Sequence, residues 1–227
     1  MYNDILAKSL ARQHECSYEI LRIDNQNNRY NSAIKAFNSV INEAKGDYLM
    51  FVHQDIALED DYFLNKVEDY FKTHPKTGIV GVAGCKDNVV YSNIEQSNPR
   101  KRVSETVLKK PKMVNSLDEC LFVIPKETLL NHPFDETLCD HWHLYAVEYC
   151  YQMKKANKDV VVLPLNAYHV SEGDFMNEGY YETLVKVAHK YQKDYKKIDT
   201  TIRSWHTNPV VLKLNIKYLR YKKKKMK

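Results

Sequence analysis

The sequence has 227 residues, a length that supports one domain with a sizeable hydrophobic core. Hydrophobic residues make up 44% of it and charged residues 28%, which is ordinary for a soluble globular protein. The sequence shows no signal peptide and no apolar run near the length of a membrane span, so we expect a cytoplasmic protein.

The five cysteines show neither a zinc pattern nor a disulfide pattern. Their number is odd, and no two of them have C-x-x-C spacing. Four of them lie in or beside apolar runs, as small core residues do. A reducing compartment is therefore expected.

The positive charge is concentrated at one end of the chain. The formal net charge is +5, but eight basic residues and no acidic residue lie between Lys213 and Lys227. Without them, 26 basic residues face 29 acidic ones, a net charge of −3. The basic character therefore belongs to a tail, and the mildly acidic body argues against a nucleic-acid-binding protein.

Helical and strand-like patterns alternate along most of the chain, which predicts an α/β fold with a mostly parallel sheet flanked by helices. A polar stretch without periodicity, residues 86–112, is predicted to be a long irregular excursion that covers an active site. Helices are expected at residues 3–13, 32–43, 59–72, 126–131, 142–156 and 180–195, and strands at residues 18–23, 48–52, 78–84, 118–125 and 159–164.

The strand at residues 48–52 is short, bulky and preceded by a turn, as a fully buried strand is. It is followed by His53-Gln54-Asp55, and such polar exits lie at the carboxyl edge of a sheet, where α/β folds bind ligands. An imidazole and a carboxylate there could hold a metal ion. The alternative is that Asp55 only caps a helix.

Asp24 and Asn25 follow the strand predicted at residues 18–23. Their side chains could accept hydrogen bonds from a nucleotide base or ribose. Equally, they could only shape a turn.

Several segments, in this order, resemble those of the bacterial family 2-like glycosyltransferases of the GT-A fold, which use nucleotide-sugars. The resemblance covers residues 2 to about 195. It is carried by Tyr2-Asn3-Asp4, by Glu19 to Asn25, by Asn38 to Phe51, by Phe134-Asp135-Glu136, by Glu148 to Gln152, and by Tyr168-His169-Val170-Ser171.

The sequence departs from this family in three places. The family's D-x-D motif is replaced by the H-Q-D variant at residues 53–55, and Tyr145-Ala146 stands where an acidic pair is usual. The family's first buried strand would precede Tyr2, so we expect a GT-A fold whose first strand is missing. Either the true start lies upstream, or the chain is a truncated, non-catalytic relative that binds a nucleotide or a partner protein.

The resemblance implies a donor site with a divalent metal ion, Mn²⁺ or Mg²⁺. It makes Asp55 and His169 the metal ligands, and His169 has the alternative of an ordinary histidine with one backbone hydrogen bond. A carboxylate with an imidazole suits Mn²⁺ somewhat better than Mg²⁺. The nucleotide-sugar is expected to contact Asp24, Asn25, His53 and Gln54.

An inverting transfer also needs a general base for the acceptor hydroxyl. Asp140, His143 and Glu148 cluster around the start of one predicted helix and are the candidates. Asp140 could instead only cap that helix. The expected reaction is hexosyl transfer to a glycan or a lipid-linked glycan, in surface-polysaccharide synthesis.

We divide the chain into a glycosyltransferase domain at residues 1–205 and a basic amphipathic tail at residues 206–227. The tail combines apolar residues with the run from Lys222 to Lys225, a pattern that suits an anionic membrane surface. Peripheral binding at the inner face of the cell membrane is therefore expected. A frayed terminus and a nucleic-acid-binding arm are the alternatives.

Overall fold

The computed structural model describes residues 4–171 and 176–225, so Tyr2 and Asn3 lie outside the described residues. Its helices are α1 (Leu6–Leu10), α2 (Ala33–Ile41), α3 (Phe63–Thr73), α4 (Lys126–Asn131), α5 (Tyr145–Lys155), α6 (Glu178–Tyr191) and α7 (Pro209–Lys225). Its strands are β1 (Tyr48–Val52), β2 (Ile56–Leu58), β3 (Thr77–Gly81), β4 (Ala83–Lys86), β5 (Val89–Ser92), β6 (Ile94–Gln96), β7 (Lys101–Arg102), β8 (Lys112–Met113), β9 (Ser116–Leu117), β10 (Leu121–Pro125), β11 (Asp159–Val162), β12 (Ala167–His169), β13 (Lys197–Asp199) and β14 (Ser204–His206).

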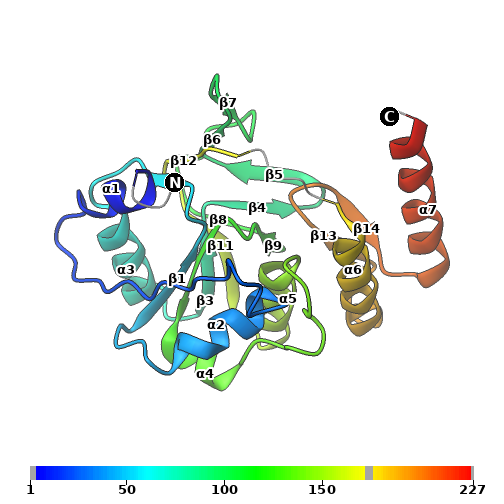
Figure 1. Ribbon diagram of the computed structural model, residues 1–227, viewed down its shortest axis with the longest axis horizontal. Helices are drawn as coiled ribbons and strands as arrows, with labels where there is room; N and C mark the ends of the chain where they lie inside the picture. Colours follow the sequence, from blue (N-terminus) through cyan, green and yellow to red (C-terminus); the bar gives the residue numbers. More distant parts are fainter. Residues whose placement is uncertain (1–3, 172–175, 226–227) are drawn as a thin grey trace.

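The central sheet has five strands in the order β1-β10-β3-β11-β8 (Figure 1). The predicted α/β class is confirmed, but the sheet is more mixed than expected. Strand β11 pairs with β3 in parallel, whereas β10 lies between β1 and β3 and runs antiparallel to both. The start of β10 therefore lies at the same edge of the sheet as the end of β1.

Helices cover both faces of this sheet, because side chains alternate between the faces along each strand. One face packs against α2 and α5 and includes Phe51 and Phe122, whose rings stack 5.0 Å apart. The other face packs against α1 and α3 and includes Val80 and Val123. Burying each large apolar side chain in this way contributes about 1.5–3 kcal/mol.

A second sheet, in the order β2-β12-β6-β7, lies at the edge where β1 ends. Two of its strands come from residues 86–112, which also supply β5 and the start of β8. The prediction of an irregular excursion there is therefore wrong. These strands have only two to four residues, too few to show a period in the sequence.

The strand predicted at residues 18–23 is also wrong, because this segment is irregular. Tyr18, Ile20 and Leu21 are 45%, 46% and 37% exposed. A strand needs a neighbour for its backbone hydrogen bonds, and the only strand paired with β1 in the described part of the chain is β10. No strand precedes β1 within those residues.

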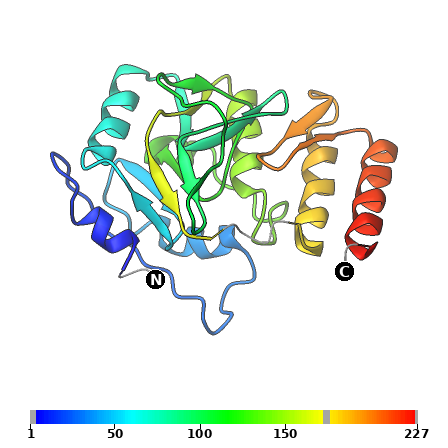
Figure 2. The same cartoon turned by 90° about the horizontal axis from the view of Figure 1, so that it is seen from above.

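The last part of the chain, with α6, α7 and the β13–β14 hairpin, lies beside the main sheet (Figure 2). It forms a third apolar cluster with one side of α5, and Trp205 is fully buried there. The hairpin of β13 and β14 packs there with α6 and α7. Asn208 caps α7, since its Oδ1 accepts the backbone N–H groups of Val210 and Val211 at 3.0 and 3.2 Å. Within the described ranges, no helix combines the length and the apolar character that crossing a membrane would need.

Candidate active site

The end of β1 and the end of β12 bring the predicted metal ligands together. The backbone N–H of His53 donates to the Cys120 carbonyl at 2.9 Å, which holds the chain beside the start of β10 as β1 ends. The chain then turns into β2, whose first residue, Ile56, pairs with His169 of β12. Asp55 and His169 therefore meet at one edge although they are far apart in the sequence.

His53, Asp55 and His169 form one cluster of possible metal ligands. One ligand atom from each lies within 4.8 Å of the others, and His169 Nε2 lies 3.4 Å from Asp55 Oδ1. The sequence placed His53 at the donor rather than at the metal, whereas the structure brings its ring to 5.7 Å from that of His169. Two imidazoles and one carboxylate facing one point suit Mn²⁺ or another transition metal better than Mg²⁺.

The electrostatics of the cluster favour the protonation states that bind a metal. Partial desolvation of the ring lowers the pKa of His53, and His169 lowers it further, against the opposing charge of Asp118. Burial alone would raise the pKa of Asp55, but hydrogen bonds with His169 and Ser171 hold it well below its usual range. A neutral imidazole and an ionised carboxylate are the forms that coordinate cations.

A row of side chains extends from this cluster across the second sheet. His169 pairs with Gln96 of β6, and Gln96 pairs with Lys101 of β7, so all three point to the same face. With strands about 4.8 Å apart, Lys101 begins about 10 Å from His169. The neighbouring Arg100 points elsewhere, since it pairs with Glu59 and lies over the ring of Tyr168.

Sequence reasoning missed the acidic pair Asp118-Glu119, which Cys120 separates from the first residue of β10. Burial, and then the charge of Asp118, raises the pKa of Glu119 to about 8. Its Oε1 is buried and has no hydrogen-bond partner among the described residues. The sequence signal was two acids beside a buried strand, but only the antiparallel direction of β10 shows that they lie at the edge where β1 ends.

Asp24 and Asn25 use their side chains within their own loop. Asp24 Oδ1 accepts the backbone N–H of Gln26 at 2.9 Å. Asn25 is bonded twice to the backbone of Tyr30, at 2.9 and 2.7 Å. This geometry fits the turn interpretation, and a contact with a nucleotide stays a prediction. Gln54 is exposed beside the metal-ligand cluster.

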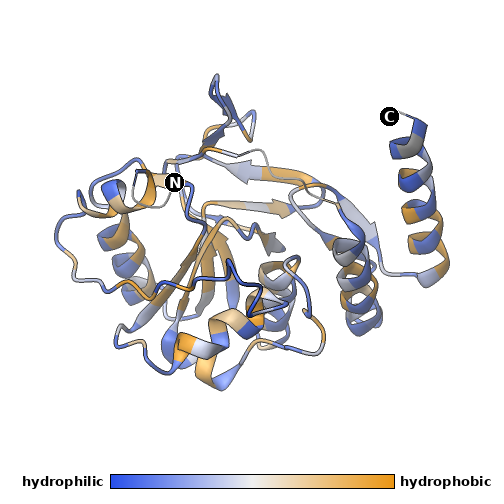
Figure 3. Ribbon diagram, viewed as in Figure 1, coloured by the Kyte–Doolittle hydropathy of each residue, from blue (hydrophilic) through white to orange (hydrophobic). Residues whose placement is uncertain are grey.

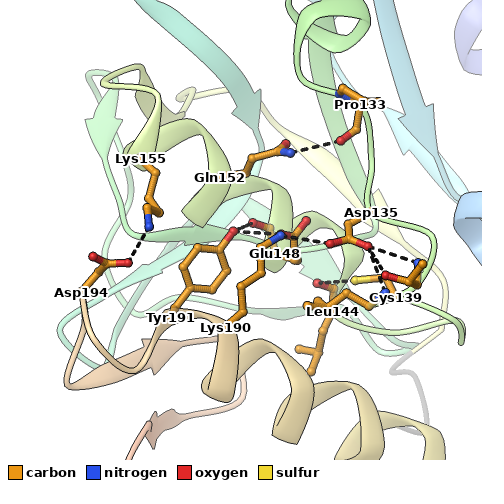
Figure 4. A network of polar contacts seen from close by, with 12 residues as sticks. Pro133, Asp135, Cys139, Leu144, Glu148, Gln152, Lys155, Lys190, Tyr191 and Asp194 are labelled. Atoms are coloured by element: carbon orange, nitrogen blue, oxygen red, sulfur yellow. Dashed lines mark hydrogen bonds and ion pairs between the residues drawn. The ribbon is translucent and has the colours of Figure 1, made fainter.

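Glu148 is buried in a network between α5 and α6 (Figure 4). Its side chain is 1% exposed, and its Oε1 lies 2.7 Å from Lys190 Nζ and 2.8 Å from the hydroxyl of Tyr191. Lys190 also reaches Asp135 at 3.2 Å. This carboxylate is already charge-compensated and serves the packing of the two helices.

Asp140 and His143 lie in the loop before α5. Asp140 pairs with Lys186 of α6 at 2.6 Å, and this ammonium overcomes the effect of burial and lowers the pKa of Asp140. The alternative of Asp140 as a helix cap is wrong, because the residue before α5 is Leu144, without a side-chain cap. The ring of His143 lies edge-on to Tyr180, with centroids 5.8 Å apart.

The α/β fold, with candidate ligand side chains at the exits of β1 and β12, is of the GT-A type, and comparisons with solved structures agree. S. aureus TarS 1–349, solved with UDP-GlcNAc, superposes with a TM-score of 0.54 at 15% identity over 86% of this chain and 64% of that one. GalNAc-T7, solved with UDP, GalNAc and Mn²⁺, gives 0.53 at 16% identity over 73% of this chain. The chain spans 36% of that structure's length. At such identities the likeness shows the fold.

The model of the glycosyltransferase like family matches residues 2–197, so the chain belongs to that family. It is also similar to the protein of ATP synthase subunits region ORF 6 of Fuscovulum blasticum. The two are 21% identical over 187 residues, which cover 77% of this chain and 72% of the relative.

Proposed function

We propose that this protein transfers a hexose, with inversion, from a nucleoside diphosphate sugar to a glycan acceptor, using a divalent metal ion. The observation that carries this proposal is the cluster of His53, Asp55 and His169 at the exits of two strands, in a chain of the glycosyltransferase like family. UDP-sugars are the first donors to test, because both structural neighbours were solved with UDP or a UDP-sugar.

In this proposal, different side chains around the cluster contact different parts of the donor. His53, Asp55 and His169 would hold Mn²⁺, which supplies positive charge to the leaving diphosphate. Gln96 and Lys101 face the same side as His169 and would bind a phosphate that extends away from the metal. Gln54, Asp24 and Asn25 are the predicted contacts of the nucleotide.

Glu119 is our first candidate for the general base, and His143 the second. The pKa of Glu119, raised to about 8, makes its ionised form a stronger base than an ordinary carboxylate, and that form is the minor one at neutral pH. Its unpartnered Oε1 could accept the proton of a hydroxyl group. Glu148 and Asp140 rank lower, because each carboxylate is bonded to a lysine of α6.

A thermal-shift series with UDP, UDP-GlcNAc and Mn²⁺ tests the donor site. At about 100 times the dissociation constant a ligand stabilises by about 2.7 kcal/mol, or roughly 5–10 °C. The substitution Asp55→Asn should abolish the shift, Lys101→Ala should weaken it, and Asp69→Asn, an exposed carboxylate on α3, should leave it intact. No shift in the wild type, or an equal shift in Asp55→Asn, would refute the proposal.

We infer that the acceptor is a glycan or a lipid-linked glycan in surface-polysaccharide synthesis. The second candidate function, a non-catalytic relative that binds a nucleotide or a partner protein, is favoured by β1, which pairs with β10 alone among the strands of the described residues. Release of UDP from UDP-GlcNAc distinguishes the two. Turnover that disappears in Asp55→Asn supports the enzyme, whereas binding without turnover supports the relative.

A further inference from the structure

Helix α7 has two apolar sides, and only one of them is covered. Leu212 and Ile216 are 3% and 6% exposed and pack with Trp205 and α6, together with the partly buried Leu219. The ion pair of Arg220 with Glu178 fastens the same side of the helix to the start of α6. The helix is therefore a packed part of the fold and not a frayed end.

Helix α7 lies at the outer end of the molecule, beyond α6 (Figure 1), and its ribbon alternates between hydrophobic and hydrophilic residues (Figure 3). Its side opposite the contacts with α6 presents a line of large side chains to solvent. Val210, Leu214, Tyr218 and Tyr221 are 68%, 61%, 64% and 56% exposed. At 100° per residue they fall within an arc of about 80°, and from first to last they span about 17 Å along the axis. We call these four residues the outer stripe.

Basic residues border the outer stripe on both sides. Lys213 and Lys217 lie along one border and Lys222 along the other, by their positions on the helix. The helix contains no acidic residue at all. An apolar line bordered by lysines is the pattern by which a helix lies in the interface of a membrane, with the lysines at anionic headgroups.

The other partners fit this surface less well. A second copy of the chain packed through the same stripe would bring lysines against lysines, because a two-fold interface places the same patch on both sides. Nucleic acid would satisfy the lysines but leave the stripe without an apolar partner. A membrane containing anionic lipids satisfies both features.

We propose that the outer stripe of α7 and its bordering lysines form a docking surface for anionic membranes. Docking there would place the protein beside lipid-linked acceptors, and this link to the reaction rests on the proposed function. The docking itself depends on α7 alone, on the opposite side of the helix from its contacts with α6 and Trp205.

Co-sedimentation of the full chain with phosphatidylcholine vesicles, with and without phosphatidylglycerol, tests the surface. The wild type should bind the anionic vesicles, and the binding should weaken with salt. Each lysine near an anionic surface contributes about fivefold, so Lys213→Gln, Lys217→Gln and Lys222→Gln together should reduce binding about 100-fold. Leu214→Asp should lose at least tenfold, since a charge replaces an apolar contact.

The matched control is Leu130→Asp, a similarly exposed leucine on α4 (55%, against 61% for Leu214), which should bind as the wild type does. Circular dichroism checks that each variant is folded. No vesicle binding by the wild type would overturn the proposal, as would equal binding of Leu214→Asp and Leu130→Asp. Oligomerisation or nucleic-acid binding that Leu214→Asp abolishes, without vesicle binding, would also overturn it. None of these outcomes depends on UDP binding, so the proposed function is judged separately.

Discussion

Removing the ammonium of Lys190 should destabilise the protein far more than removing that of Lys155, although both lysines pair with a carboxylate at 2.7 Å. The partner of Lys190 is Glu148, whose side chain is 1% exposed, whereas Asp194, the partner of Lys155, is 40% exposed. Figure 4 shows both pairs at the junction of α5 and α6. The comparison isolates the effect of burial on an ion pair.

The expected loss of unfolding free energy depends on the environment of the carboxylate that each substitution leaves without its lysine. Lys190→Ala leaves a buried carboxylate without its cation, a change that costs about 3–5 kcal/mol in buried pairs. Because Lys190 is 34% exposed and Tyr191 still donates to Glu148, we expect the lower end, about 3 kcal/mol. Lys155→Ala breaks an exposed pair and should cost less than about 1 kcal/mol.

Urea unfolding followed by circular dichroism measures both variants, with the free energy of unfolding as the readout. Glu148→Gln combined with Lys190→Ala should recover part of the loss, since the uncompensated charge is then gone. Equal losses in Lys190→Ala and Lys155→Ala would refute the reasoning. So would a double variant that is no more stable than Lys190→Ala.

Two further predictions concern a buried acid and a close backbone contact. Burial raises the pKa of Glu119 from 4.5 to about 8, so the folded state binds a proton there that the unfolded state has lost. As the pH rises from about 5 to 8, the wild type should therefore lose stability relative to Glu119→Gln, by at most about 1.4 kcal/mol per pH unit. Urea unfolding of both proteins at each pH measures this. A difference in unfolding free energy that stays constant with pH would contradict the prediction. Gly84→Ala should cost about 1–3 kcal/mol, because its Cβ would lie 2.5 Å from the Ser116 carbonyl, whereas Gly46→Ala, with no atom nearer than 3.5 Å, should cost little in the same assay. Equal stability of the two alanine variants would show that β4 and β9 can move apart.

Much of the metal-ligand cluster was predictable because it follows from where strands end. Asp55 follows β1 and His169 ends β12, and an α/β sheet brings such strand ends to one edge. The expectation that β1 is fully buried is wrong, because only Phe51 of its five residues is buried. Glu119 was not predictable in this way, since its place depends on β10 running antiparallel between β1 and β3. Sequence patterns show that a segment is a strand, but not its direction.

The other differences also come from tertiary context. Residues 18–23 have the composition of a strand, but they do not pair with β1 or any other strand in the described part of the chain. The sequence made Glu148 a candidate for the general base, because its partners come from α6, 42 and 43 positions later in the sequence. Such distant partners leave no local signal.

The ligand cluster also has a consequence for folding, because its members come from segments far apart in the chain. Asp55 and His169 are 114 positions apart, and a cation held by both would close a loop of that length. Closing such a loop costs an unfolded chain about 4 kcal/mol of conformational entropy. The folded chain has no such cost, because folding already brings Asp55 and His169 together. A metal ion would thus act as a reversible cross-link between the two sheets, and the protein should unfold more cooperatively with it than without.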